Sequence, residues 1–91
     1  MTIARRFIVR GRVQGVGFRY FAVRAARQAG VSGSVRNLAD GTVEAIAEGT
    51  VSSIDKFRIE LQHGPSYGHV ERIDEMEIGP TGRYSGFDVV Y

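Results

Sequence analysis

Three glycines and one arginine near the N-terminus could together bind an anion. Gly11, Gly15 and Gly17 lie between a predicted strand and a predicted helix, and Arg19 follows in the first helical turn. Glycine tolerates positive φ, so the chain can turn several N–H groups inward and form a nest for an anion. The helix N-terminus adds unpaired amides and its dipole. The Arg19 guanidinium can then bind two oxygens of one phosphate group.

Two better-known phosphate-binding motifs do not fit this stretch. A Walker A loop requires Gly-Lys followed by Ser or Thr, whereas this chain has Gly17-Phe18-Arg19. The dinucleotide fingerprint requires a third small residue where this chain has Tyr20. We therefore expect residues 11–19 to hold a phosphate group without nucleotide–magnesium chemistry. The alternative is that they form a flexible strand-to-helix connection.

Asn37 is the second candidate for chemistry. It falls within the predicted strand Val35–Ala39, which can lie beside the glycine-rich loop in one sheet. Asparagine is depleted in strands, so its presence there asks for a reason. Its amide both donates and accepts hydrogen bonds, as orienting a water molecule requires. The alternative is an edge or turn asparagine that bonds its own backbone.

The spacing of apolar residues along the chain predicts the strands and helices that must position these residues. Strands have period 2 and β-branched residues, whereas helices space apolar residues at three and four. The predicted elements are a strand around Phe7–Arg10, a helix over Phe18–Ala29 stopped by Gly30, the strand Val35–Ala39, a two-residue hairpin at Asp40-Gly41, a strand over Thr42–Glu48, a helix capped by Ser52 with Asp55 and ending at His63, an irregular strand over Val70–Ile78 and a closing strand over Gly86–Tyr91.

This order predicts one α+β domain over residues 1–91. Two right-handed βαβ crossovers joined by a hairpin give a ferredoxin-like βαββαβ sandwich, an antiparallel sheet with both helices on one face and a short terminal strand. We expect Tyr20, Phe21, Phe57 and Phe87 in the core, with Tyr20 able to line the rim of the site. Fold alone does not settle function.

The composition limits the classes of site and partner. The 91 residues include no cysteine, which excludes disulfides, thiolate metal sites and a cysteine nucleophile. No run approaches the roughly 20 apolar residues of a membrane span, and no signal peptide is evident, so we expect a cytoplasmic protein without a membrane partner. The histidines His63 and His69 lack convergent ligands, so we expect no metal and no cofactor.

Charge is distributed unevenly along the chain. Eight arginines and no acid precede Asp40, whereas four bases and all ten acids follow Ala39. This asymmetry favours an anionic partner for the first part of the chain. The alternative is that the two parts interleave in the fold and their charges offset. RNA binding is not expected, because the third predicted strand has no aromatic residue to stack on bases and the first has only Phe7.

The motifs resemble those of the acylphosphatase family over nearly the whole chain. The resemblance covers Val9–Arg19, above all Val13-Gln14-Gly15-Val16-Gly17-Phe18-Arg19, then Gly33, Val35, Asn37 and Asp40-Gly41-Thr42-Val43-Glu44, and finally Gly64-Pro65 and Phe87–Tyr91. Ser34, where the family often has an aromatic residue, and Tyr67-Gly68-His69 depart from the commonest pattern. Neither departure touches Arg19 or Asn37.

The resemblance implies metal-independent hydrolysis of acyl phosphates to a carboxylate and inorganic phosphate. It implies that Arg19 and the loop residues Gln14, Gly15, Val16, Gly17 and Phe18 hold the phosphoryl group, while Asn37 positions the attacking water. We expect a stand-alone monomer. Two alternatives stay open: a non-catalytic ferredoxin-like module that binds an anion or small ligand, and the acylphosphatase-like domain of a larger carbamoyl-transfer protein.

Overall fold

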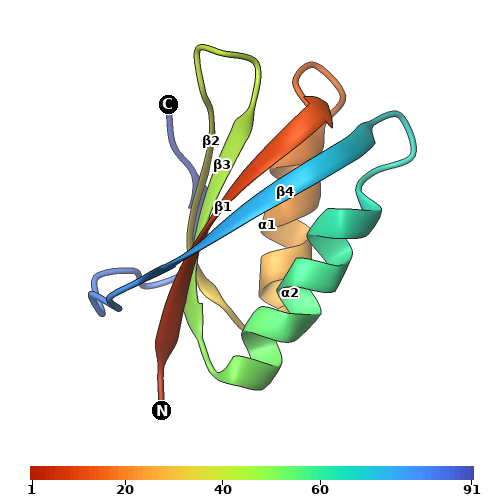
Figure 1. The fold of residues 1–91 in the computed structure, drawn as a ribbon. Coiled ribbons are helices and arrows are strands. Elements are labelled where there is room, and N and C mark those ends of the chain that lie inside the picture. Colours follow the sequence, from red (N-terminus) through yellow and green to blue (C-terminus); the bar gives the residue numbers. More distant parts are fainter.

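The computed structural model describes residues 1–91, and its elements follow the predicted order (Figure 1). They are β1 (Ile3–Arg12), α1 (Phe18–Ala29), β2 (Ser32–Asn37), β3 (Val43–Gly49), α2 (Val51–His63), β4 (His69–Ile78) and β5 (Phe87–Val89). Both helices cover the same face of the sheet. The predicted ferredoxin-like α+β fold is therefore confirmed.

The five strands lie in the order β4-β1-β3-β2-β5. All pairs are antiparallel except β2 with β5, which run parallel, so the sheet is mixed rather than wholly antiparallel as the sequence predicted. The register of β1 against β4 shifts between Arg10 and Gly11, which is the irregularity expected in the fourth strand. The sheet order places β2 and β4 on opposite flanks of β1, and the loop that follows β1 lies between their ends.

One apolar cluster joins the sheet to both helices. It contains 17 buried residues, and Phe57 of α2 lies at its centre, with its ring centroid 5.8 Å from that of Phe7 and 5.4 Å from that of Phe87. Phe57 and Phe87 are core residues as predicted, and Phe21 is partly buried against the cluster. The placement of Tyr20 in the core was wrong, because its side chain is 70% exposed. No helix is long and apolar enough to cross a membrane.

Helix α1 has both predicted ends, because Gly30 adopts the left-handed conformation that closes a helix and donates its N–H to Ala26 O at 2.9 Å. The capping prediction for α2 was wrong. Thr50, not Ser52, caps this helix, since the Thr50 Oγ1 accepts from Ser53 N–H at 3.1 Å. Asp55 instead accepts from Arg58 at 2.6 Å.

The β2–β3 connection also differs from its prediction. Strand β2 ends at Asn37, so Leu38–Thr42 form a five-residue loop in place of a two-residue hairpin at Asp40-Gly41. Asp40 Oδ1 accepts from the Thr42 N–H at 3.0 Å and from its hydroxyl at 2.6 Å. These bonds close a turn around Asp40 and hold the pKa of its carboxyl below the ordinary value. Asn37 therefore ends its strand rather than lying in the middle of it.

Gly11 belongs to β1 and not to the glycine-rich loop. Its φ of 129° is the positive value expected, but it serves the bulge, where a Cβ would collide with the backbone oxygen of His69. Arg12 also belongs to β1, as its last residue. The anion-binding stretch that the sequence predicted over residues 11–19 therefore begins only after Arg12.

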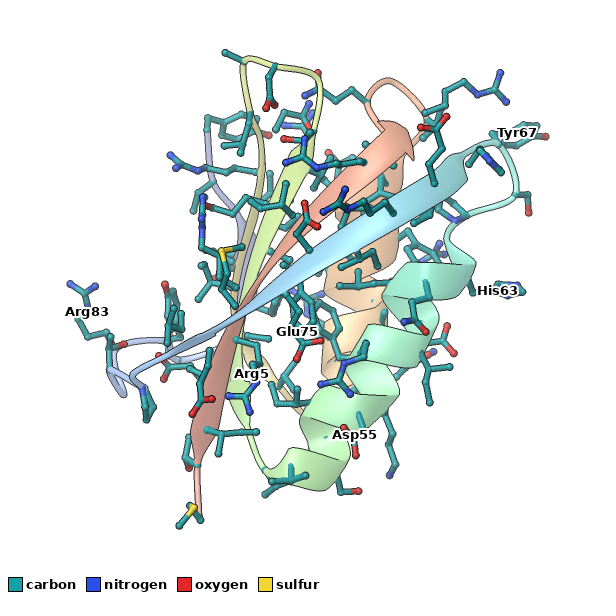
Figure 2. The ribbon with its side chains drawn as sticks, viewed as in Figure 1. Arg5, Asp55, His63, Tyr67, Glu75 and Arg83 are labelled. Carbon is teal, nitrogen blue, oxygen red and sulfur yellow. The ribbon has the colours of Figure 1, made fainter.

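Ion pairs join the basic first part of the chain to the acidic second part. Glu44 accepts from Arg6 at 2.7 Å and from Arg36 at 2.9 Å, and Asp74 accepts from Arg10 at 2.9 Å. Near α2, Arg58 binds Asp55 and Glu75, and Figure 2 shows Arg5 beside Glu75. Charges of these two parts do offset one another. The arginines left without an ion pair are Arg12, Arg19, Arg24, Arg27 and Arg83.

Candidate active site

The loop between β1 and α1 presents a row of free backbone N–H groups. Gly15 and Gly17 have φ of 75° and 77°, a conformation that directs successive amides to one side of the chain. The N–H groups of residues 13–17 donate to no protein acceptor, and the first bond closing α1 runs from Phe21 N–H to Gly17 O at 3.0 Å. No side chain caps the helix at Gly17. The loop and helix N-terminus together therefore offer an anion nest.

Arg19 and Asn37 lie at this nest, as the sequence predicted. A cavity of about 150 Å³ is lined by Val13, Gly15, Gly17, Phe18, Arg19, Tyr20 and Asn37. Arg19 comes from the first turn of α1 and Asn37 from the end of β2. The two residues line one cavity because β2 lies beside β3, which pairs with β1 on its other side, so the ends of β1 and β2 lie at the same end of the sheet.

The Arg19 guanidinium is charged, unpaired and oriented by an aromatic ring. It forms no ion pair with a carboxylate, and its central carbon lies 5.3 Å from the ring centroid of Tyr91. A guanidinium over a ring face is attracted by the ring's quadrupole and loses part of its rotational freedom. This contact leaves the N–H groups of Arg19 available for oxygens of an anion.

Asn37 carries the one buried side-chain nitrogen or oxygen atom that lacks a hydrogen-bond partner. Its Oδ1 is shielded from solvent and accepts from no protein group. The alternative that Asn37 bonds its own backbone is therefore excluded in this structure. A buried amide oxygen without a partner costs about 1–3 kcal/mol, so an external donor at this point is favoured. The residue Asn37 lines the same cavity as Arg19.

The side chain of Gln14 binds within the protein, while its backbone N–H stays free for the contact with phosphate that the sequence predicted. Its Nε2 donates to Leu38 O at 2.8 Å and to Thr42 O at 2.9 Å. These acceptors lie in the loop that directly follows Asn37. The side chain of Gln14 thus ties the anion nest to the element that carries Asn37.

The remaining loop residues contribute unequally to the cavity. Gly15 and Gly17 line it directly. Phe18 also lines the cavity, although the residue is only 1% exposed and its side chain packs in the core. Val16 lines a neighbouring groove instead, together with Gly17 and Tyr20. Sequence reasoning missed the Tyr91 ring, since only the parallel pairing of β5 with β2 brings the end of the chain beside Arg19.

Known proteins share both the sequence and the fold around this site. The acylphosphatase family model matches residues 5–89, which include the loop, Arg19 and Asn37. The chain belongs to the acylphosphatase family. An acylphosphatase of Mannheimia succiniciproducens is 44% identical over 87 residues, covering 96% of this chain and 97% of the relative. The protein accordingly hydrolyses acyl phosphates to a carboxylate and inorganic phosphate.

Solved structures agree with this assignment. The crystal structure of acylphosphatase from Bacillus subtilis covers 100% of both chains with a TM-score of 0.93 and 37% identity. The full-length HypF structure in its phosphate- and nucleotide-bound form matches with a TM-score of 0.88 and 28% identity, covering 100% of this chain but 12% of HypF. The acylphosphatase fold therefore also occurs as a small part of a larger protein.

Proposed function

We propose that the β1–α1 loop and Arg19 hold the phosphoryl group of an acyl phosphate while Asn37 holds the attacking water. The observation that carries this proposal is that Asn37 lines the cavity that Arg19 also lines and that its Oδ1 accepts from no protein group. An acceptor there can take a hydrogen bond from a water molecule and so direct the lone pair of the water oxygen at phosphorus. The free amides and the guanidinium supply donors for the phosphoryl oxygens.

Hydrolysis then follows as an in-line displacement at phosphorus. The water oxygen forms a bond to phosphorus, the bond from phosphorus to the acyl oxygen breaks, and the electron pair leaves with the carboxylate. The water proton passes to a phosphoryl oxygen, so no side-chain base is required. Because a carboxylate is a good leaving group, no strong general acid is required either. Catalysis is then mainly positioning and stabilisation of charge on the equatorial oxygens.

The same donor set accounts for the predicted independence from metal. The guanidinium and the helix N-terminus supply positive charge where a metal ion would otherwise neutralise the phosphoryl oxygens. No three His, Cys, Asp or Glu side chains are grouped to hold such an ion. We expect hydrolysis of acetyl phosphate to continue at the same rate in excess chelator. Loss of activity that added Mg²⁺ restores would contradict this prediction.

The experiment for the phosphoryl site compares Arg19→Gln with Arg83→Gln. Both variants remove one exposed or half-exposed arginine that forms no ion pair, but Arg83 lies on a distant part of the molecule (Figure 2). We expect Arg19→Gln to lower kcat/KM for acetyl phosphate by about 10²–10³-fold and to weaken inhibition by inorganic phosphate. Arg83→Gln should change neither. Phosphate inhibition of unchanged strength in Arg19→Gln would overturn the assignment.

The protein is further proposed to act as a single-domain monomer. One apolar cluster joins all strands except β4, which packs on it through Val70 and Ile73. Light scattering in solution tests the monomeric state, and a dimeric mass would contradict it. The cytoplasmic location stays a prediction, which cell fractionation tests.

A further inference from the structure

A cationic groove adjoins the active site on the side away from Asn37. It has a volume of about 990 Å³ and lies between the exposed face of α1 and the segment 63–68 that joins α2 to β4. Gly17 and Tyr20 line both this groove and the active-site cavity. Gly17 has no side chain, and a Cβ at this position would meet open space. No side chain of Gly17 therefore separates the groove from the active-site cavity.

The charged side chains that line the groove are both arginines. Arg24 and Arg27 are exposed, line the groove and form no ion pair, and His63 lines it from the end of α2. No carboxylate is among the lining residues. Glu60 lies beside Arg24 in an adjoining cavity but makes no ion pair with it. The groove thus keeps two arginine charges that the rest of the fold does not neutralise.

The arginines are within reach of a substrate held at the nest. A helix rises about 1.5 Å per residue, so Arg24 lies about 10 Å along the axis from Gly17. Helical side chains lean toward the helix N-terminus, which brings the Arg24 guanidinium back over the turn of Tyr20. An anionic group a few bonds from the phosphoryl group can therefore meet Arg24, and a longer one can meet Arg27.

The in-line reaction sends the acyl group toward this groove. Strand β2, which carries Asn37, lies on one flank of β1, whereas β4 and the segment before it lie on the other. The leaving oxygen must lie opposite the attacking water. If Asn37 holds the water, the acyl group leaves on the side of residues 63–68. Figure 2 shows His63 and Tyr67 projecting at that end of the molecule.

The wall opposite α1 is held in a defined position. Arg12 donates to Tyr67 O at 3.0 Å, and Gly68 N–H donates to Pro65 O at 3.1 Å. Gly68 approaches β1 so closely that a Cβ would lie 3.1 Å from Arg12 O and 3.2 Å from the Val16 side chain. Tyr67 itself is 79% exposed at the rim. The segment that departs from the commonest family pattern thus forms a built wall of the groove.

We propose that this groove binds the acyl part of the substrate and selects acyl groups that carry a second negative charge. This inference rests on the proposed positions of the phosphoryl group and water. Arg24 and Arg27 bind a carboxylate or phosphate at the far end of the acyl chain, and the neutral groove walls tolerate the chain between. The residues determine specificity and take no part in the displacement at phosphorus.

The test compares two substrates in paired variants. Acetyl phosphate has no second charge, whereas succinyl phosphate, the monophosphate anhydride of a four-carbon dicarboxylic acid, has one. We expect Arg24→Gln combined with Arg27→Gln to lower kcat/KM for succinyl phosphate by about tenfold, the effect of one charge-assisted bond. The value for acetyl phosphate should stay within about twofold, as expected for a distant exposed charge.

Two further variants separate this inference from its alternatives. Arg83→Gln removes the same charge at a distant site and should leave the ratio of the two substrates unchanged. Arg19→Gln should lower both substrates by the same factor, and failure of that result would count against the phosphoryl site rather than the groove. An equal fall for both substrates in the Arg24 and Arg27 variant, or no fall for succinyl phosphate, would overturn the groove assignment.

Discussion

Gln14 donates a side-chain N–H to the backbone oxygen of Leu38 at 2.8 Å, which joins the β1–α1 loop to the strand end that carries Asn37. A second bond from the same nitrogen reaches Thr42 O at 2.9 Å. Both backbone oxygens also have a second donor: Leu38 O accepts from Gly41 N–H, and Thr42 O accepts from Leu38 N–H. The bond pair therefore fixes the distance between the two halves of the active site more than it stabilises the turn.

Gln14→Leu should lower kcat while the protein stays folded. The variant frees the loop after Asn37 from the nest, and a displacement near 1 Å from reactive geometry can cost about 10²-fold in rate. We expect a 10- to 100-fold fall in kcat for acetyl phosphate with a cost in unfolding free energy of about 1 kcal/mol. Gln62→Leu, which changes an exposed glutamine of α2, is the matched control. A fall in stability without a fall in kcat would show that Gln14 is merely structural.

Tyr91 should act on substrate binding through Arg19. Its ring lies 5.3 Å from the guanidinium carbon, and an exposed cation–π contact contributes about 0.5–1 kcal/mol. Tyr91→Leu should therefore raise KM for acetyl phosphate by about two- to fivefold. Tyr91→Phe keeps the ring face and should retain the wild-type KM. Equal effects of the two substitutions would exclude the ring as the cause.

Glu48 should stabilise the fold at neutral pH and lose this effect in acid. Burial would raise the pKa of its carboxyl, but N–H donors from Thr81 and Gly82 and the Thr81 hydroxyl outweigh that effect and lower it below 4.5. Because the folded-state pKa lies below the unfolded value, the stabilisation is complete above the unfolded pKa. It disappears as the pH falls through the folded pKa.

Urea unfolding of Glu48→Gln tests this carboxylate. We expect the variant to lose about 1–3 kcal/mol of unfolding free energy at pH 7, and the difference from wild type to shrink at pH 3. Asp74 and Glu75 also have lowered pKa values, because their carboxyls accept bonds from Arg10 and Arg58. The wild type alone is therefore not diagnostic. Glu60→Gln is the control, and a difference that stays constant with pH would contradict the prediction.

The sequence predicted most elements because their end signals were unambiguous. Helix α1 has apolar residues at helical spacing and Gly30 immediately after it, so both of its bounds were correct. The cap of helix α2 was placed two residues too late, because Ser52 with Asp55 three residues on matches a capping box, whereas the observed bond runs from Ser53 N–H to the Thr50 side chain. Strand β2 was placed too late, since Leu38 and Ala39 continue its apolar pattern although the chain already turns there.

The candidate site was predictable in its parts but not in its connections. Glycine spacing and residue type pointed to the nest, Arg19 and Asn37, and all three line one cavity. The bonds from Gln14 to Leu38 and Thr42 follow from tertiary placement across 24 and 28 residues, which no local pattern contains. The same holds for Tyr91, whose position depends on how β5 pairs with β2.

The division of labour between Arg19 and Asn37 is most directly tested by measuring kcat and inhibition by inorganic phosphate in Asn37→Ala. In the proposed function Asn37 contacts water rather than the phosphoryl group, so kcat for acetyl phosphate should fall by about 10²-fold or more. The inhibition constant for phosphate should stay within about twofold of the wild-type value, since the nest and Arg19 are intact. A kcat near that of wild type, or phosphate binding that weakens as much as kcat falls, would contradict the assignment of Asn37 to the water.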